Sequence, residues 1–260
     1  MATPDSESFV RTFARGLRVI EVMGQSTGHQ TIAQVSDAAQ LPRTVVRRLL
    51  LTLAELGFVK TDEKCYWLTP KVLRLGLTYL YTLPFWRQSQ LILEELGTRI
   101  QQSCAIAVLD GREIVYVQRF HAKRILAMSP LIGSRLPAHI VSMGRVLIAG
   151  QSDENLNDYL AESELKKFTR LTVTDSAKLR QAITASREQG YCWVDGEYDE
   201  AICGIAVPVR DQHGEVVAAV NVSLVSGEYT EKQALAQFLP LLRLTASRLK
   251  AATPAADAST

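Results

Sequence analysis

The sequence has few cysteines, and their spacing excludes two common stabilising frameworks. The 260 residues contain four, namely Cys65, Cys104, Cys192 and Cys203. No Cys-x-x-Cys pair occurs and no histidine lies at zinc-finger spacing, so neither a disulfide scaffold nor a structural metal site is indicated. We expect reduced, partly buried thiols and no bound metal.

Long apolar runs are also missing. None approaches the roughly 18 residues that a membrane-spanning helix needs. The first residues, MATPDSESF, contain no basic segment followed by an apolar stretch, so they do not resemble a secretion signal. We therefore expect a cytoplasmic protein that makes no membrane contact.

Two nucleotide-binding signatures are absent as well. The sequence contains no Walker loop and no Gly-x-Gly-x-x-Gly motif. Gly-x-Ser-x-Gly occurs once, as GQSTG at 24–28, but it follows a predicted helix, whereas the nucleophile of a hydrolase stands at a strand-to-helix turn. Hydrolases of that type, nucleotide-dependent enzymes and Rossmann dehydrogenases therefore lack support. We expect no cofactor, and we assign no catalytic residue.

What remains is the composition of an ordinary globular protein, with 47% apolar and 22% charged residues. The length exceeds the common size of one domain, which favours two domains. Charge is divided unevenly. Residues 1–90 hold 11 Lys/Arg and 7 Asp/Glu, a net +4, whereas residues 91–260 hold the other 18 and 20, a net −2. A basic N-terminal part is compatible with nucleic-acid binding.

Residues 1–70 have the pattern of a winged helix-turn-helix. Helical periodicity over 14–23 is followed by a loop, by Thr31 as a helix cap and by a short helix in IAQVSDAA. A third helix is predicted from Pro42 to about Leu56, ending at Gly57. Two short β-like segments, FVKT and CYWL, then flank a charged turn and predict a hairpin, the wing.

The third helix separates its residues into two faces. Six apolar residues fall within an arc of roughly 140°, opposite the arginines, namely Val45, Val46, Leu49, Leu50, Leu53 and Leu56. Leu51 lies on the arginine side. Solvated charges behind a core helix are one interpretation of these arginines. Their position in the entry turn, before a wing, favours contact with the DNA major groove. Charged hairpin tips are common in any protein, so the wing lysines are weaker candidates. The candidate DNA-binding residues are Thr31, Arg43, Thr44, Val45, Arg47, Arg48, Lys60 and Lys64.

Residues 71–100 are predicted to be linker helices. The segment is helical in period and interrupted at Pro84, so we expect a break near residues 83–85. It carries more apolar residues than one core would absorb. Part of this surface is therefore expected to form a dimer contact.

Residues 101–250 change to an α+β pattern. We expect a β-hairpin from SCAIAVLD and EIVYVQRF, a third strand in RILAMSP and a loop running into a helix in IGSRLPAHIVSMGRVLIAG. Helices over 153–164 and 175–189, strands YCWV, CGIAVPVRD and EVVAAVNVSL, and a helix over about 230–250 follow. Roughly six strands with flanking helices predict an antiparallel sheet of the kind found in small-molecule sensor domains. Residues 251–260 are expected to be a flexible tail.

The segment GSRLPAHIVSMGR is the candidate ligand site. If Pro137 begins the helix, its first N–H groups accept an anion and Arg135 adds positive charge. An apolar sheet opposite, including Val207, would suit the ring or chain of an organic acid. The alternative is a helix packed on the sheet with His139 satisfied by hydrogen bonds. The candidate ligand-binding residues are Gly133, Ser134, Arg135, Leu136, Ala138, His139, Ser142, Met143, Ile205, Val220 and Val222.

The acidic loop with Asp195, Glu197, Asp199 and Glu200 has two interpretations. Paired carboxylates can perform acid/base chemistry, but no nucleophile or metal ligand accompanies them. We therefore expect a solvated loop.

The sequence resembles the IclR family of bacterial transcriptional regulators over nearly its whole length. The resemblance rests on the order and spacing of ARGLRVIEVM, LPRTVVRRLLLTLAELGFV, IGSRLPAHIVSMGRVLIA and REQGYCWVDGEYDEAICGIAVPVRDQHGEVVAAVNVS. It implies a GAF-like effector domain, and a dimer or a dimer of dimers. Within the family, LTPKVLRLG and SCAIAVLDGREIVYVQR look most like the protocatechuate and β-ketoadipate regulators. Cys203, a further candidate effector residue, stands where that subgroup is expected to have an arginine.

The combined hypothesis is a transcriptional regulator that binds double-stranded operator DNA and senses a small organic acid. The resemblance points to an aromatic carboxylate or a ring-cleavage product. Two alternatives stay open. An enzyme acting on a small acid through His139 or the acidic loop would convert its ligand. A sensor that has lost DNA binding would show no salt-sensitive affinity for DNA.

Overall fold

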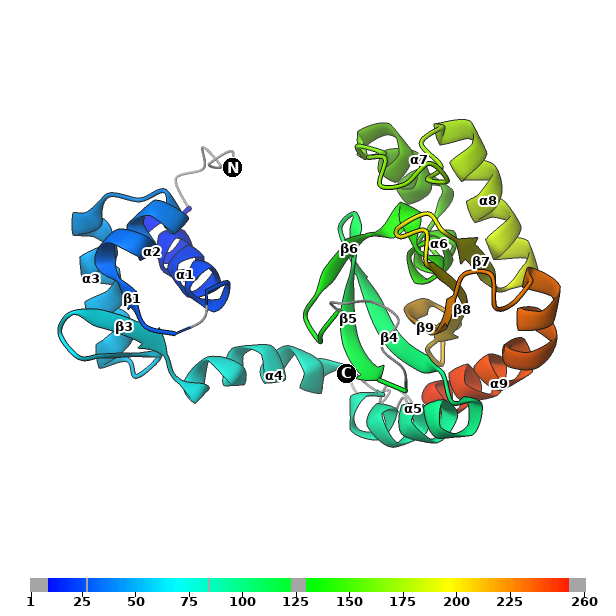
Figure 1. The fold of residues 1–260 in the computed structure, drawn as a ribbon, viewed down its shortest axis with the longest axis horizontal. Coiled ribbons are helices and arrows are strands. Elements are labelled where there is room, and N and C mark those ends of the chain that lie inside the picture. The colour runs from blue at the N-terminus through cyan, green and yellow to red at the C-terminus, as the bar shows by residue number, and fades with distance from the viewer. Residues whose placement is uncertain (1–8, 27, 84, 123–129, 253–260) are drawn as a thin grey trace. The chain divides into compact units, whose positions relative to one another are not determined.

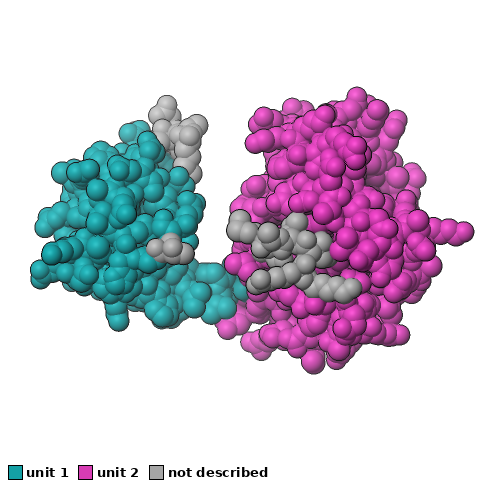
Figure 2. Space-filling model, viewed as in Figure 1, with its two compact units in different colours: residues 1–80 teal, residues 81–260 magenta. Residues whose placement is uncertain are grey.

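A computed structural model describes residues 9–26, 28–83, 85–122 and 130–252. The chain forms two compact units, residues 1–80 and 81–260 (Figure 2). The segment 71–100, predicted as a linker, is divided between them. None of the described helices is long and apolar enough to cross a membrane.

The N-terminal unit is a winged helix-turn-helix, as predicted (Figure 1). Its three-stranded sheet has the order β1-β3-β2. Strand β1 was not expected and pairs antiparallel with β3. The elements are α1 (Arg11–Gly24), β1 (Gln30–Thr31), α2 (Ile32–Ala39), α3 (Arg43–Glu55), β2 (Val59–Thr61) and β3 (Cys65–Leu68).

Local sequence signals determine where the two helices of the helix-turn-helix pair, α2 and α3, begin. Thr31 caps α2 in a capping box, in which its hydroxyl accepts from the Gln34 amide at 3.3 Å. Pro42 is the N-cap of α3, with φ −58°, so the helix begins one residue later than predicted. Proline suits this place because its missing N–H has no helical partner there.

The end of α3 is a Schellman motif. The Phe58 amide donates to the Leu53 carbonyl at 2.9 Å, and the Gly57 amide donates to the Ala54 carbonyl at 2.9 Å. Gly57 has φ +77°, in the left-handed region. Leu56, predicted on the apolar face, is 51% exposed because it is the C-cap residue, where the core ends.

One face of each N-terminal helix forms the small core of this unit. On α3 that face is Val46, Leu49, Leu50 and Leu53, as the periodicity predicted. The core therefore fixes which side of α3 remains exposed.

The chain then continues through a 3₁₀ turn (Pro70–Val72), α4 (Leu73–Thr82) and α5 (Trp86–Ile100). The predicted break between the two helices is confirmed, and Phe85 there is fully buried. No residue of α4 is buried, whereas α5 buries an apolar face that includes Leu93 and Leu96.

The second unit is built on a six-stranded sheet of order β6-β5-β4-β9-β8-β7, with every pairing antiparallel. Helices α5 and α9 cover one face, and α6 with α8 covers the other (Figure 1). The further elements are β4 (Ser103–Asp110), β5 (Glu113–Phe120), β6 (Arg135–Pro137), a 3₁₀ turn (Ala138–Ile140), α6 (Ser142–Ala149), α7 (Asp153–Glu162), α8 (Ser176–Gln189), β7 (Cys192–Asp195), β8 (Ile202–Arg210), β9 (Val216–Val225) and α9 (Glu231–Ala251).

Two local predictions in this unit are corrected. Residues 135–137, expected in a loop, form strand β6 because their backbone pairs with Glu113–Val115 of β5. Pro137 therefore ends a strand and does not begin a helix, and α6 starts at Ser142. The strand expected at 124–130 falls almost entirely outside the described residues, as does most of the expected tail.

The left-handed residue that ends α3 gives a first prediction. Gly57→Ala should lower the free energy of unfolding by roughly 1–2 kcal/mol, because a Cβ disfavours positive φ. Crowding contributes little, since the nearest atom to an added Cβ is Lys71 Cδ at 3.8 Å. Urea unfolding followed by circular dichroism measures the change.

Gly76→Ala is the matched control. Gly76 lies inside α4 with nothing within 4 Å of an added Cβ. Alanine should stabilise that helix by up to about 1 kcal/mol. Equal losses in the two variants would contradict the role given to the conformation of Gly57.

Candidate functional site

The exposed side of the helix-turn-helix carries a shallow depression of about 440 Å³. It brings together side chains from the cap of α2, the first turns of α3 and the wing tip, although these are separate in the sequence. The lining residues are Thr31, Ile32, Ala33, Arg43, Thr44, Arg47 and Lys64. Most of the predicted DNA-binding residues therefore share one surface.

The other predicted DNA-binding residues lie around this depression. Arg48 and Lys60 are exposed but do not line it. Val45 is half-buried and packs against the N-terminal core, so most of its side chain faces away from solvent. No described carboxylate forms an ion pair with Arg43, Arg47 or Arg48. Their charges are available to a polyanion.

The second unit contains a cavity of about 70 Å³ between the sheet and the start of α6. Strands β4, β5, β8 and β9 contribute polar or small residues, and the β7–β8 loop forms another wall. The lining residues are Ser103, Tyr116, Arg119, Pro130, Leu136, Ile140, Val141, Ser142, Met143, Val194, Glu197, Tyr198, Ile202, Cys203, Gly204, Asn221 and Ser223.

Arg119 and Asn221, two of the polar lining residues, belong to one row across the sheet. Arg119 of β5 pairs with Ala105 of β4, which pairs with Asn221 of β9. Directly paired residues point to the same face of a sheet. Arg119 and Asn221 therefore stand on either side of Ala105, whose small side chain leaves space between them. The neighbouring row, which contains Ser103, Ser223 and Gly204, is also small.

A β-bulge brings Arg119 onto this face. Gln118 pairs with Ile106 but Tyr116 pairs with Ala107, so Val117 is an extra residue in β5. Without it, strand alternation would direct Tyr116 and Arg119 to opposite faces. The bulge places both side chains in the cavity. Sequence reasoning missed Arg119 because strict alternation gives it the wrong side.

None of the described carboxylates forms an ion pair with Arg119 in this cavity. Its Nε is buried and has no hydrogen-bond partner among the described residues. Its guanidinium carbon lies 5.6 Å from the Tyr116 ring centroid, a cation–π contact. Burial lowers the pKa of the Arg119 guanidinium, whereas burial raises the pKa of Tyr116 to about 12 and keeps its phenol neutral. A half-buried guanidinium with a buried, unpartnered Nε favours an anionic ligand.

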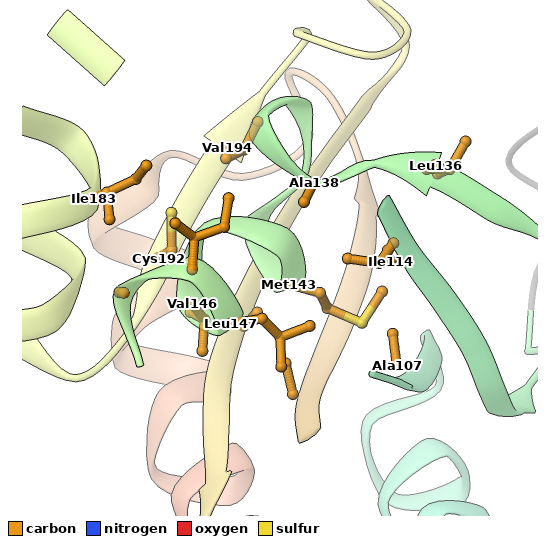
Figure 3. Close-up of a cluster of buried hydrophobic side chains, with 14 of the residues drawn as sticks. Ala107, Ile114, Leu136, Ala138, Met143, Val146, Leu147, Ile183, Cys192 and Val194 are labelled. Carbon is orange, nitrogen blue, oxygen red and sulfur yellow. The ribbon is translucent and has the colours of Figure 1, made fainter. Parts of the chain in front are cut away.

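The N-terminus of α6 meets the same cavity. Val141, Ser142 and Met143 line it, and no side chain caps the helix. Met143 also reaches into the buried cluster that contains Ile114 and Leu136 (Figure 3). A helix start therefore lies at the cavity, but the helix begins at Ser142 and not at Pro137 as predicted.

The predicted ligand residues divide between this cavity and other places. Leu136, Ser142, Met143 and Cys203 line it. Arg135 does not, because it is an exposed strand residue that pairs with Asp110 at 2.7 Å and Glu113 at 2.7 Å. The preceding turn, with Gly133 and Ser134, bonds to the backbone of Tyr116 and does not line the cavity.

Further corrections concern the buried predicted residues. Ala138 and His139 are buried in the 3₁₀ turn before α6 and do not line the cavity; the His139 ring lies 3.5 Å from the Lys166 carbonyl. Strand alternation places a second set on the opposite face of the sheet, toward α5, where Cys104 of the same row donates to Leu93. That set is Ile205, Val220 and Val222.

The acidic loop was predicted to be solvated, and this is wrong for one of its carboxylates. Glu197 is 7% exposed and pairs with Arg145 of α6 at 2.6 Å. Its carboxylate also accepts from the Val173 amide at 2.9 Å, and the Arg145 Nε donates to the His139 carbonyl at 2.8 Å. The pair joins α6, the β7–β8 loop and the segment before α8. No feature of the sequence marked Glu197 apart from its acidic neighbours.

Comparison with family models covers both units. The IclR helix-turn-helix domain matches residues 12–63, and the bacterial transcriptional regulator IclR C-terminal model matches residues 77–251. The chain belongs to the IclR family.

Relatives of this IclR-family protein include two named bacterial regulators. It is 39% identical to the Pca regulon regulatory protein of Pseudomonas putida, over 92% of this chain and 82% of the relative. It is 33% identical to the p-hydroxybenzoate hydroxylase transcriptional activator of Acinetobacter baylyi, over 94% and 92%. These relatives are named as transcriptional regulators and not as enzymes, and they support the protocatechuate subgroup.

Solved structures agree with the fold. A transcriptional regulator from Rhodococcus sp. RHA1 has a TM-score of 0.84 and 38% identity, covering 94% of this chain and 98% of that one. A double mutant of the inducer-binding domain of PobR from Acinetobacter, in complex with 3-hydroxybenzoic acid, has a TM-score of 0.59 and 32% identity, covering 63% of this chain and 96% of that one. An IclR homologue from Microbacterium hydrocarbonoxydans, complexed with 4-hydroxybenzoate, has a TM-score of 0.81 and 24% identity, covering 93% and 98%.

The buried ion pair gives a second prediction. Glu197→Met should lower the free energy of unfolding by roughly 3–5 kcal/mol, because it leaves the Arg145 charge buried without a partner. Glu200→Met is the control. Glu200 forms an exposed pair with Arg170 at 3.2 Å, and losing such a pair costs about 0–1 kcal/mol. Thermal and urea unfolding measure both, and similar losses would contradict a special role for Glu197.

Proposed function

We propose that this IclR-family regulator reads operator DNA through the arginine face of α3 and responds to a hydroxylated organic acid in the cavity of the second unit. The observation that carries the ligand proposal is Arg119, a half-buried cation whose Nε is buried and unpartnered among the described residues, beside an uncapped helix start. The DNA proposal rests on the shared surface of α3 and the wing tip.

The first turns of α3 have the composition of a major-groove reader. Arg43 and Arg47 are one helical turn apart and exposed, with Thr44 between them. Arginine can hold guanine O6 and N7 with two hydrogen bonds, or it can bind phosphates. Lys64 at the wing tip lines the same depression and would contact the DNA backbone.

Two features of the cavity favour a carboxylate. The Arg119 guanidinium supplies fixed positive charge, and the free N–H groups at the start of α6 supply hydrogen-bond donors at the positive end of a helix dipole. No described carboxylate pairs with Arg119. The carboxylate of a ligand would therefore provide the missing counter-charge.

Asn221 favours a ligand that also donates a hydrogen bond. Its Oδ1 is buried without a partner among the described residues. Only strand β4 separates it from Arg119, so the two Cα atoms are roughly 10 Å apart at the usual strand spacing. In a hydroxylated aromatic acid, the carboxylate would bind Arg119, the hydroxyl would donate to Asn221 and the flat ring would lie between them. Hydroxybenzoates in the two homologous complexes support this class.

Ligand entry would have to enlarge the cavity. Its volume of about 70 Å³ is below the roughly 150 Å³ of a cavity that accepts benzene. Side chains such as Met143 must then shift when the acid binds. A ligand that binds two arrangements unequally shifts the balance between them, which is what regulation requires.

We also infer that the protein acts as a homodimer or a dimer of dimers. Large apolar side chains of α4 are exposed, including Leu73 at 67% and Leu75 at 49%. Apolar surface of this extent on one helix is typical of a protein contact. Operator sites for helix-turn-helix dimers have matching two-fold symmetry.

The DNA proposal predicts a loss of binding on removing two arginines. Arg43→Ala with Arg47→Ala should weaken binding to the promoter beside the gene by roughly 1–3 kcal/mol for each lost base contact. If either arginine binds a phosphate, the slope of log affinity against log salt concentration should become shallower by about one for each lost contact. Gel shifts over a salt series measure both. Arg170→Ala with Arg180→Ala, which removes two positive charges from the second unit, should leave binding intact. An equal loss of binding in that control would contradict the assignment.

The ligand proposal predicts that Arg119→Met abolishes most acid binding. Loss of a charge-assisted hydrogen bond should weaken 4-hydroxybenzoate and protocatechuate by roughly 10- to 100-fold. Thermal shift against ligand concentration measures this, because a ligand of the folded state raises its stability. Benzoate, muconate and β-ketoadipate, which lack a hydroxyl donor, should give smaller shifts.

Arg135→Met is the matched control for Arg119. Arg135 was the cation that the sequence favoured, but its carboxylate partners lie outside the cavity. Its removal should leave acid binding unchanged. A loss in this variant, with binding retained in Arg119→Met, would reverse the assignment.

A further inference from the structure

Helix α4, which follows the DNA-binding unit's wing, has no buried side chain to hold its direction. None of its residues, Leu73–Thr82, is buried. A helix without a buried face is held less firmly by apolar packing than a core helix is. The segment that precedes α4 therefore takes a larger part in setting its orientation relative to α3 within this unit.

That segment is bound to the last turn of α3 at several points. The Thr69 hydroxyl donates to the Gly57 carbonyl at 2.6 Å and accepts from the Lys71 amide at 3.3 Å. One side chain thus joins the end of α3 to the start of the following 3₁₀ turn. The Thr69 amide also donates to the Phe58 carbonyl at 2.9 Å.

Lys71 supplies the second group of contacts. Its Nζ donates to the Leu56 carbonyl, the C-cap of α3, at 2.7 Å. A cation at this position also suits the negative end of the α3 dipole. The same ammonium lies 5.1 Å from the Phe58 ring centroid. Both contacts of the Lys71 ammonium are therefore with residues at the end of α3, Leu56 and Phe58.

We propose that Thr69 and Lys71 form a clasp that makes the DNA-reading helix α3 and the linker helix α4 move as one body. The contacts join the Schellman turn of α3 directly to the turn from which α4 continues. A change in the direction of α4 is therefore passed to α3 and is not absorbed between them. Thr69 and Lys71 act as positioning residues and need not touch DNA.

The clasp extends the proposed function, on which its regulatory meaning rests. Effector binding can alter DNA affinity only if the two sites bias the same structural equilibrium. A flexible joint between α3 and α4 would let the linker move without moving the reading helix. The clasp removes that freedom.

Two substitutions open the clasp without touching the N-terminal core. Thr69→Val removes both side-chain hydrogen bonds at similar volume, and Lys71→Met removes the ammonium but keeps an unbranched side chain. Neither residue belongs to the buried core of this unit. Thr69→Ser with Lys71→Arg restores a hydroxyl and a cation, and Arg74→Met removes an exposed positive charge from α4 as a control.

A distance measurement tests the clasp without ligand or DNA. Spin labels are placed at Glu55→Cys and Thr78→Cys in a Cys65→Ser background of the full chain, diluted with unlabelled protein to suppress distances between copies. The parent, Arg74→Met and the Ser/Arg variant should each give a narrow distance distribution. The Val/Met variant, and Lys71→Met alone to a smaller extent, should give a broader one. An equally narrow distribution in the Val/Met variant overturns the proposal.

A second measurement tests the regulatory consequence. Promoter DNA affinity is compared with and without 4-hydroxybenzoate or protocatechuate. A coupling of roughly 5-fold or more in the parent should fall toward one in the Val/Met variant, while affinity without acid is retained. Retained coupling with a broadened distance distribution overturns the regulatory role. If the parent does not respond to either acid, the proposed effector class fails, and the distance measurement alone decides the clasp.

Discussion

The placement of Arg119 by a single extra residue in β5 is the constraint on which the cavity depends. The bulge at Val117 turns Tyr116 and Arg119 to the same face of the sheet. Around that cation the face carries small residues, Ala105 above all, and the uncapped start of α6 closes the space. The strand register therefore places a positive charge, a small cavity and hydrogen-bond donors next to one another.

The Arg145–Glu197 pair holds the wall opposite β5 in position. Its partners come from α6, the β7–β8 loop and the segment before α8, and both side chains are buried. A buried pair contributes little net stability but strongly penalises arrangements that separate its members. The walls of the cavity are thus specified by electrostatics, while its floor is specified by small side chains.

The DNA-binding unit uses one helix for two purposes. The buried leucines of α3 hold it against α1 and α2, and this packing presents Arg43 and Arg47 to solvent beside the wing tip. The end of the same helix is tied to the linker by Thr69 and Lys71. The proposed DNA contact uses the exposed side of α3, the core packing uses its buried side, and the attachment to the linker uses its C-terminal end.

The sequence by itself determined the winged helix-turn-helix, the break near Pro84, the antiparallel sheet and the exposed arginine face. These follow from local signals: periodicity, caps and turn residues act over a few positions. Tertiary structure alone decided that Arg119 faces the cavity and Arg135 does not, that Ile205 and Val220 face α5 and α9, and that Glu197 is buried. One bulge reverses the side of every later residue in a strand, and an ion pair between residues 52 positions apart leaves no local pattern.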